Sequence, residues 1–316
     1  MRTRPSAPYR RAAATRAPSP VPVVRRLDLV FDPASVPRDW YGHDAHLSTF
    51  FNGLSLLFPE GEKFFVQSVR HFASRIDDAG LKRRVAAFIG QEALHSAEHR
   101  SFNEMLRAQG DELVVRLERE VRWLLILGHR ALTPKAQLAV TCALEHYTAI
   151  LAEQLLSLPE HQAAIDDALR PLWLWHALEE SEHKAVAFDV YQAVGGTYTT
   201  RIAMMILATV FFVAEVANVH TRLLADRRRF ADLRGWSSMI SFLWGREGLF
   251  RRLVGPYLDY FRPAFHPDDR DTRELVDEWA AHFAGRDKNA RRGRGQRPAK
   301  GVRRARPALT ALPASA

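Results

Sequence analysis

The stretches QEALHSAEH (residues 91–99) and WHALEESEHK (residues 175–184) decide the fold class of this chain. Each contains a glutamate that is followed three residues later by a histidine: Glu92 and His95 in the first, Glu180 and His183 in the second. Residues three apart project from the same side of an α-helix, so both members of a pair can reach one ion. About one such pair is expected by chance in a chain with 13 histidines, so the position of the pairs matters more than their presence.

Both pairs lie on the apolar stripes of amphipathic helices, and two further helices each place one acid in the same way. Glu62 is in phase with the apolar residues of 60–77, and Glu145 with those of 134–157. A buried carboxylate is costly unless it is paired or binds metal. The order Glu, Glu-x-x-His, Glu, Glu-x-x-His is the ligand pattern of di-iron and di-manganese helical bundles. We therefore predict an all-α, ferritin-like four-helix bundle with additional C-terminal helices and a two-metal site in its core.

Proline and glycine divide the chain at intervals typical of helices, and no strand-like alternation recurs. The predicted bundle core spans about 60–194 and the extra helices span 197–285. Pro59 sits where a helix can begin. The predicted helices are 43–57, 60–77, 80–108, 112–130, 134–157, 171–193, 197–229, 247–261 and 271–284.

Two histidines near the pairs have separate interpretations. His176 lies four residues before Glu180 on the same stripe, so it is either a seventh metal ligand or a residue that orients a ligand. His99, one turn after His95, is expected to orient a ligand. The other acids that flank the ligands point off the stripes, and we predict a solvated face for them: Glu98, Glu179 and Glu182.

Cys142 is the only cysteine, which excludes a disulfide within the chain and a cysteine-based zinc site. Any metal must therefore be bound by histidine and carboxylate groups. We expect two divalent ions as the cofactors, with iron as the first choice and manganese or zinc left open.

The net charge of +9 is concentrated in the two ends of the chain. Residues 1–26 hold seven Arg and no acid, and 286–316 hold ten Lys or Arg and one Asp, which leaves −7 for 27–285. Both ends lack apolar periodicity, so we predict disordered, solvated tails around one metal-binding domain. Arginine-rich tails can contact phosphates without reading a sequence, so no specific nucleic acid is expected.

One long apolar run raises the question of a membrane. Residues 202–214, IAMMILATVFFVA, contain no charge, but thirteen residues are short for a span. We predict a buried or helix-packing segment, and peripheral membrane contact through 202–244 stays open. The N-terminus has no apolar signal-peptide core, which favours a cytoplasmic protein. Association with a membrane and a homodimer are both left open.

Four stretches resemble a bacterial family described as predicted metal-dependent hydrolases, and the resemblance covers about 27–285. They are FPEGEKFF (58–65), QEALHSAEH (91–99), CALEHYTA (142–149) and WHALEESEHK (175–184). More distantly, His176, Glu180 and His183 are similar in spacing to the last-helix motif of the di-iron arylamine N-oxygenases. In that family the first of these histidines is an extra iron ligand, which is what the resemblance implies for His176.

Three functions are compatible with this pattern. The first is a di-iron enzyme that uses O₂ to oxidise or oxygenate a small organic substrate. The second is a metal-dependent hydrolase with a metal-activated water, which the family description favours. The third is a non-catalytic metal-binding or membrane-surface protein, and the helices after Gly196 argue against simple metal storage.

Overall fold

A computed structural model describes residues 19–27 and 29–295 of the chain, with side chains up to residue 284. The described residues form helices and no β-sheet, which confirms the predicted all-α class. The α-helices are α1 (Ala45–Arg70), α2 (Ala79–Ala108), α3 (Leu113–Ala131), α4 (Pro134–Ser157), α5 (Pro159–Ala164), α6 (Arg170–His183), α7 (Val186–Ala193), α8 (Tyr198–Asp226), α9 (Leu233–Trp244), α10 (Leu249–Asp259) and α11 (Arg273–Gly295).

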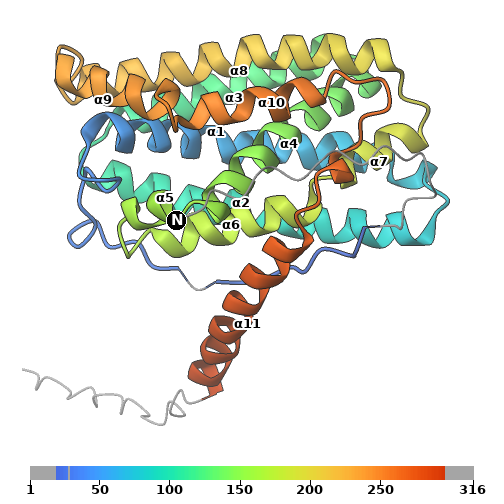
Figure 1. The fold of residues 1–316 in the computed structure, drawn as a ribbon, viewed down its shortest axis with the longest axis horizontal. Coiled ribbons are helices and arrows are strands. Elements are labelled where there is room, and N and C mark those ends of the chain that lie inside the picture. The colour runs from blue at the N-terminus through green and yellow to red at the C-terminus, as the bar shows by residue number, and fades with distance from the viewer. Residues whose placement is uncertain (1–18, 28, 296–316) are drawn as a thin grey trace, which may run out of the picture.

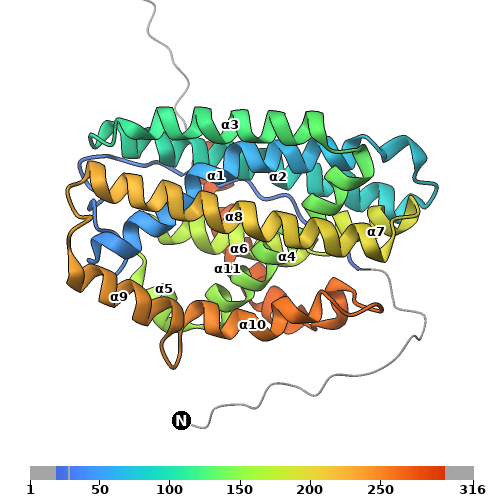
Figure 2. The ribbon, with the colours of Figure 1, turned by 90° about the horizontal axis from the view of Figure 1, so that it is seen from above.

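Four helices enclose the interior in which the predicted ligands lie. Helix α1 packs against α2, α4 packs against α6, and contacts between α1 and α4 and between α2 and α6 close the arrangement. Helices α3 and α8 both pack against α1 and cover one side of it, and α10 packs against α4 (Figures 1 and 2). Helix α11 projects away from the other helices at its C-terminal end (Figure 1).

Side-chain caps set the start of three of the four helices that carry the predicted ligands, α1, α2 and α4. Asp44 accepts hydrogen bonds from two backbone amides in the first turn of α1, and Asp78 accepts one from Leu81 at the start of α2. Thr133 caps α4 in the same way, and Pro134 follows it at the first helical position, as predicted. These caps satisfy amide groups that have no partner within the helix.

Pro59 does not begin a helix, because α1 runs through it without a break, so the predicted division into 43–57 and 60–77 is wrong. A proline inside a helix leaves the carbonyl four residues earlier without its usual donor. Here that carbonyl belongs to Ser55, and the side-chain amide of Asn103 on α2 donates to it at 3.2 Å. A long-range contact therefore compensates for the missing bond, and such a contact cannot be read from local sequence.

Three other predicted boundaries differ from the structure. The segment 171–193 is two helices, α6 and α7, and His183 ends the first of them. Helix α9 lies in a stretch for which no helix was predicted. Helix α11 continues to Gly295, so the predicted disordered tail from residue 286 is wrong for its first ten residues.

The chain before Leu27 is part of the folded domain, so the predicted boundary of the N-terminal tail is also wrong. Residues 19–27 run as an extended segment across α6. Arg25 is buried there between the carboxylates of Glu179 and Glu182. Most of the two predicted tails, residues 1–18 and 296–316, lies outside the described residues.

Helix α8 has one face on the bundle and one face in contact with solvent. Its apolar stretch was predicted to be buried or to pack on other helices. It does pack on α1 and α4, but Ile206, Val210, Phe211 and Val213 are each at least half exposed, so the stretch is not fully buried. The helix is long and apolar enough to cross a membrane, and 22% of its most apolar 18-residue stretch is buried. Because α8 packs lengthwise against α1 and α4, it runs alongside the bundle rather than away from it.

Candidate metal centre

All seven side chains predicted as metal ligands lie inside the four-helix interior, and each is at most 5% exposed. Helix α1 contributes one of them, α2 two, α4 one and α6 three. They are Glu62, Glu92, His95, Glu145, His176, Glu180 and His183.

Glu180 lies at the middle of this cluster because its two oxygens face different histidines. Its Oε1 is 3.1 Å from Nε2 of His176 and 3.4 Å from Nδ1 of His95. Its Oε2 is 3.5 Å from Nε2 of His183. One carboxylate therefore connects two groups of nitrogen donors.

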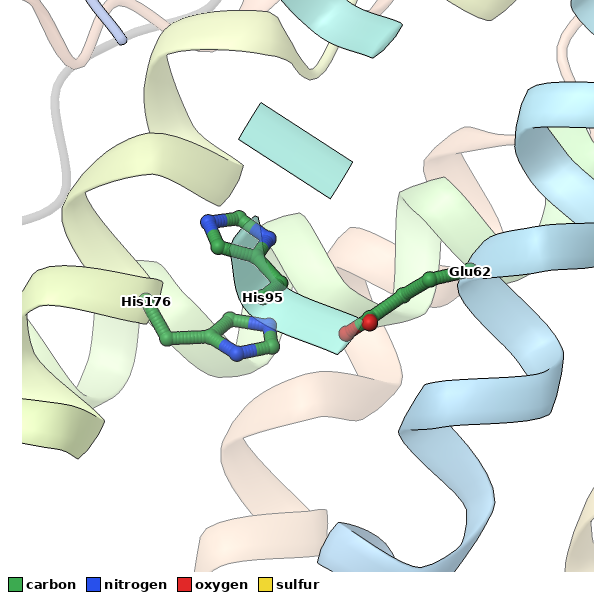
Figure 3. Close-up of side chains that lie close together, drawn as sticks. All are labelled: Glu62, His95 and His176. Atoms are coloured by element: carbon green, nitrogen blue, oxygen red, sulfur yellow. The ribbon is translucent and has the colours of Figure 1, made fainter. Parts of the chain in front are cut away.

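Three sets of ligand atoms converge closely enough to hold a metal ion. In each set one atom from each residue lies within 4.8 Å of the others. The sets are Glu62 with His95 and His176, Glu92 with His95 and Glu180, and Glu92 with Glu145 and His183. Figure 3 shows the first set, in which the Glu62 carboxylate points at the two imidazole rings. These rings stack with their centroids 4.2 Å apart.

The sequence profile of the family described as "Predicted metal-dependent hydrolase" matches residues 23–271, more than three quarters of the chain. The chain belongs to this family. No curated protein and no solved structure matches it. The match begins at Val23, whose backbone amide donates to Glu182, so the matched region includes the extended segment on α6.

The cluster contains buried polar atoms that have no hydrogen-bond partner among the residues that the structure describes. Both carboxylate oxygens of Glu62, Glu92 and Glu145 are buried without a hydrogen-bond partner, and so is Nε2 of His183. A buried polar atom without a partner costs free energy comparable to a lost hydrogen bond or more. Bound cations would satisfy these atoms together, so the donor set fits a metal centre.

Each of the three histidines uses its other ring nitrogen for a contact that fixes the ring. Nε2 of His95 is 3.2 Å from Oε2 of Glu179, and Nδ1 of His183 is 3.0 Å from Oε1 of Gln91. Nδ1 of His176 is 2.7 Å from Nε2 of His99, as expected for a histidine that orients a ligand. These contacts leave Nδ1 of His95 and Nε2 of the other two facing the carboxylates, the usual arrangement around metal-binding histidines.

Glu179 and Glu182 were predicted to face solvent, and this prediction is wrong. Glu179 is fully buried and accepts hydrogen bonds from the Trp175 indole and the Arg25 amide, at 3.0 and 2.9 Å. Glu182 forms a bidentate ion pair with the Arg25 guanidinium and accepts from the Gln91 side chain. The helix periodicity did place both acids on one side of α6, but that side faces α2 and the N-terminal segment rather than water.

The protonation of the cluster reflects the competition between burial and neighbouring charges. Burial raises the pKa of Glu145 to about 8 and holds that of Glu62 well above its usual range. Burial acts to lower the pKa of His95, but contacts with Glu179 and Glu180 outweigh it and raise the pKa to about 10. Burial lowers the pKa of His176 to about 4, so its imidazole is neutral at pH 7 and has a free electron pair for a metal.

Proposed function

We propose that this chain is a ferritin-like enzyme that holds two iron ions and uses O₂ to oxidise a small organic substrate. The observation that carries the proposal is the donor set, in which four carboxylates and three imidazoles converge in a buried interior. Imidazole and carboxylate together suit iron or manganese, and the Glu, Glu-x-x-His order on four helices is typical of di-iron bundles.

The contacts support a division of the ligands between two ions. Glu62, His95 and His176 would hold one ion, and Glu145 and His183 the other. Glu180 would serve both ions, because its two oxygens face different histidines. Glu92 would also serve both, since it belongs to sets with His95 and with His183. The similarity to arylamine N-oxygenases supports His176 as the extra ligand of the first ion.

The residues of the chain prepare the centre for this chemistry. Two iron ions in such a set supply O₂ activation when bound. The surrounding helices exclude water from the ligands, and the contacts of Glu179, Gln91 and His99 fix the three imidazoles before an ion arrives.

A metal-dependent hydrolase is the second candidate function, and the description of the family favours it. In that case the same ligands would hold two ions that generate hydroxide from water. We favour oxidation of an organic substrate because the order of the proposed ligands on four helices is typical of di-iron bundles.

Metal analysis and the visible spectrum of aerobically purified full-length protein test the proposal. We expect about two irons per chain, absorption from an oxo-bridged pair, and O₂ consumption after reduction and reoxidation. Glu180→Ala should lose most of the metal, because both ions depend on this residue, and Glu98→Ala should keep it. Colourless protein with zinc or manganese that consumes no O₂ would support the hydrolase, and metal without either activity would support storage.

A further inference from the structure

A large apolar cavity lies beside the metal centre, between α1, α3, α4 and α8. Its volume is about 490 Å³, within the range of pockets that hold small organic ligands. Glu62 lines the cavity, and so do Leu127 of α3 and Phe211 of α8, both more than half exposed. The cavity therefore extends from a proposed metal ligand to the surface between α3 and α8, two neighbouring helices in Figure 2.

The wall of this cavity has almost no polar groups that are free to form hydrogen bonds with a ligand. Most of its lining is aliphatic or aromatic, and the hydroxyl groups in it are already engaged. Tyr147 donates to Thr209 at 2.9 Å, and Thr148 donates to the Glu145 carbonyl at 3.1 Å. Glu215 accepts from Asn218. Among the lining residues Glu62 is the one whose two carboxylate oxygens are buried without a partner.

A second, smaller cavity reaches the centre from the other side. Its volume is about 80 Å³, it is also apolar, and it is lined by His176 and Glu180. Phe58, Thr148 and Phe212 line both cavities and form the partition between them. Apolar space thus lies on both sides of the proposed ligands. Such a lining suits a hydrocarbon chain beside the metals better than a charged or sugar-like substrate.

We propose that the larger cavity binds a linear hydrocarbon chain, such as the acyl chain of a lipid or fatty acid, and directs it to the metal centre. This inference rests on the proposed function, since it names the substrate class of the same site. Burial of methylene groups supplies the affinity, because each CH₂ that leaves water for an apolar cavity adds to it. The metals then face a carbon chain rather than a polar headgroup.

The surface around the opening indicates that a membrane supplies the chain. Ile206, Val210 and Val213 of α8 are exposed beside it, and Trp123 of α3 is 57% exposed. Three arginines of α3 are also exposed: Arg119, Arg122 and Arg130. Apolar side chains that insert and basic side chains that contact phosphates are the features of a helix lying on an anionic bilayer.

Two glycines allow the cavity to be filled without disturbing its wall. A Cβ added at Gly128 of α3 meets no atom within 4 Å, and the same holds for Gly61 of α1. Both glycines line the cavity. Gly255 of α10 also has open space around it but lies outside the cavity, so Gly255→Leu is a matched control.

The test measures binding of cis-parinaric acid, a fatty acid that becomes fluorescent in apolar surroundings, to metal-loaded full-length protein. We expect saturable binding by the parent and by Gly255→Leu. Gly128→Leu should weaken binding at least about tenfold, because leucine occupies the space of several methylene groups. Gly61→Leu provides the same test from α1 if Gly128→Leu does not fold. Equal binding by a folded cavity variant and the parent, or no saturable binding, would overturn the inference.

Metal content measured on the same samples separates this inference from the proposed function. Metallated protein that does not bind the fatty acid contradicts the hydrocarbon site and leaves the metal centre intact. Protein that binds the fatty acid but holds no metal supports the site and contradicts the proposed function.

A second experiment tests the source of the chain by sedimentation with vesicles of phosphatidylcholine and phosphatidylglycerol. The parent should sediment with the vesicles. A variant with Val210→Glu and Val213→Glu should stay in solution yet still bind free cis-parinaric acid, because neither residue lines the cavity. Two results would contradict the membrane as the source. One is a parent that does not sediment with the vesicles, and the other is a variant whose oligomeric mass differs from that of the parent.

Discussion

Glu62 has the least favourable surroundings of the proposed ligands when no metal is bound. Both its oxygens are buried without a hydrogen-bond partner, and burial together with the neighbouring Glu92 carboxylate raises its pKa. The free energy that this arrangement costs the metal-free protein is recovered only when a cation binds. If Glu62 is a metal ligand as proposed, it is kept for metal binding at the expense of stability.

Replacing Glu62 by Leu should separate these two effects. The variant should lose metal, and its metal-free form should be more stable than the metal-free parent by about 1–3 kcal/mol. Metal analysis and denaturant unfolding of both metal-free proteins measure the change. Glu60→Leu is the control, because Glu60 pairs with Lys63 and lies partly exposed on the same helix. Full metal content in Glu62→Leu would contradict the ligand assignment.

His176 decides whether one ion has two nitrogen ligands or one. Its ring stacks on His95 and is fixed by His99, and its Nε2 faces Glu180. We predict that His176→Ala lowers the metal content from about two ions to about one and changes the visible spectrum. His146→Ala should change neither, because His146 bonds to the Pro256 carbonyl outside the cluster. An unchanged spectrum with both ions retained would show that His176 only orients a ligand.

The predictions of individual site residues depended on helix phase, that is, on which residues share the apolar stripe of a helix. This criterion has a limit. It identified the residues that converge in the interior, because a ligand must lie on the same stripe as the core. It failed for Glu179 and Glu182, because α6 has no solvated side in this part of the structure. The partner that buries them, Arg25, is more than 150 residues away, and no local pattern connects the two.

At the scale of elements, helix type and order could be predicted, and so could the breaks between α2, α3 and α4, whereas the run of α1 through Pro59 could not. By local rules Pro59 marks the start of a helix, but inside α1 the side-chain amide of Asn103 donates to the carbonyl that Pro59 leaves without its usual donor. Similarly, the exposure of α8 depends on which helices cover it. Apolar composition predicted a buried or helix-packing segment; α8 does pack on α1 and α4, but they cover only one of its faces.

The extended segment 19–26 is the element whose role is easiest to isolate. It places Arg25 on Glu179, and Glu179 contacts His95. We predict that a chain starting at Ser19 binds metal like the full-length protein, whereas a chain starting at Leu27 binds it about 10–100-fold more weakly. Competition with a chelator measures the affinity, and circular dichroism checks that both chains stay helical. Equal affinities would show that the segment has no influence on the centre.

At the scale of the whole molecule, metal binding changes the proton content of the core. In the metal-free protein at pH 7, Glu145 with a pKa of about 8 and His95 with a pKa of about 10 both carry a proton. A bound ion requires both groups without their protons, so loading should release protons and the apparent affinity should rise from pH 6 to pH 8.

Calorimetric titration of the metal-free protein in two buffers with different heats of ionisation counts the released protons. A binding heat that is the same in both buffers would contradict the predicted release.

The long sequence distance between Arg25 and α6 sets an order of assembly during synthesis. Arg25 leaves the ribosome early, but Glu179 and Glu182 are translated more than 150 residues later. Until then the N-terminal segment has no site to dock on, and the side of the centre next to His95 stays uncovered. The docking of this segment therefore has to follow the synthesis of α6, the last of the four helices that carry the proposed ligands.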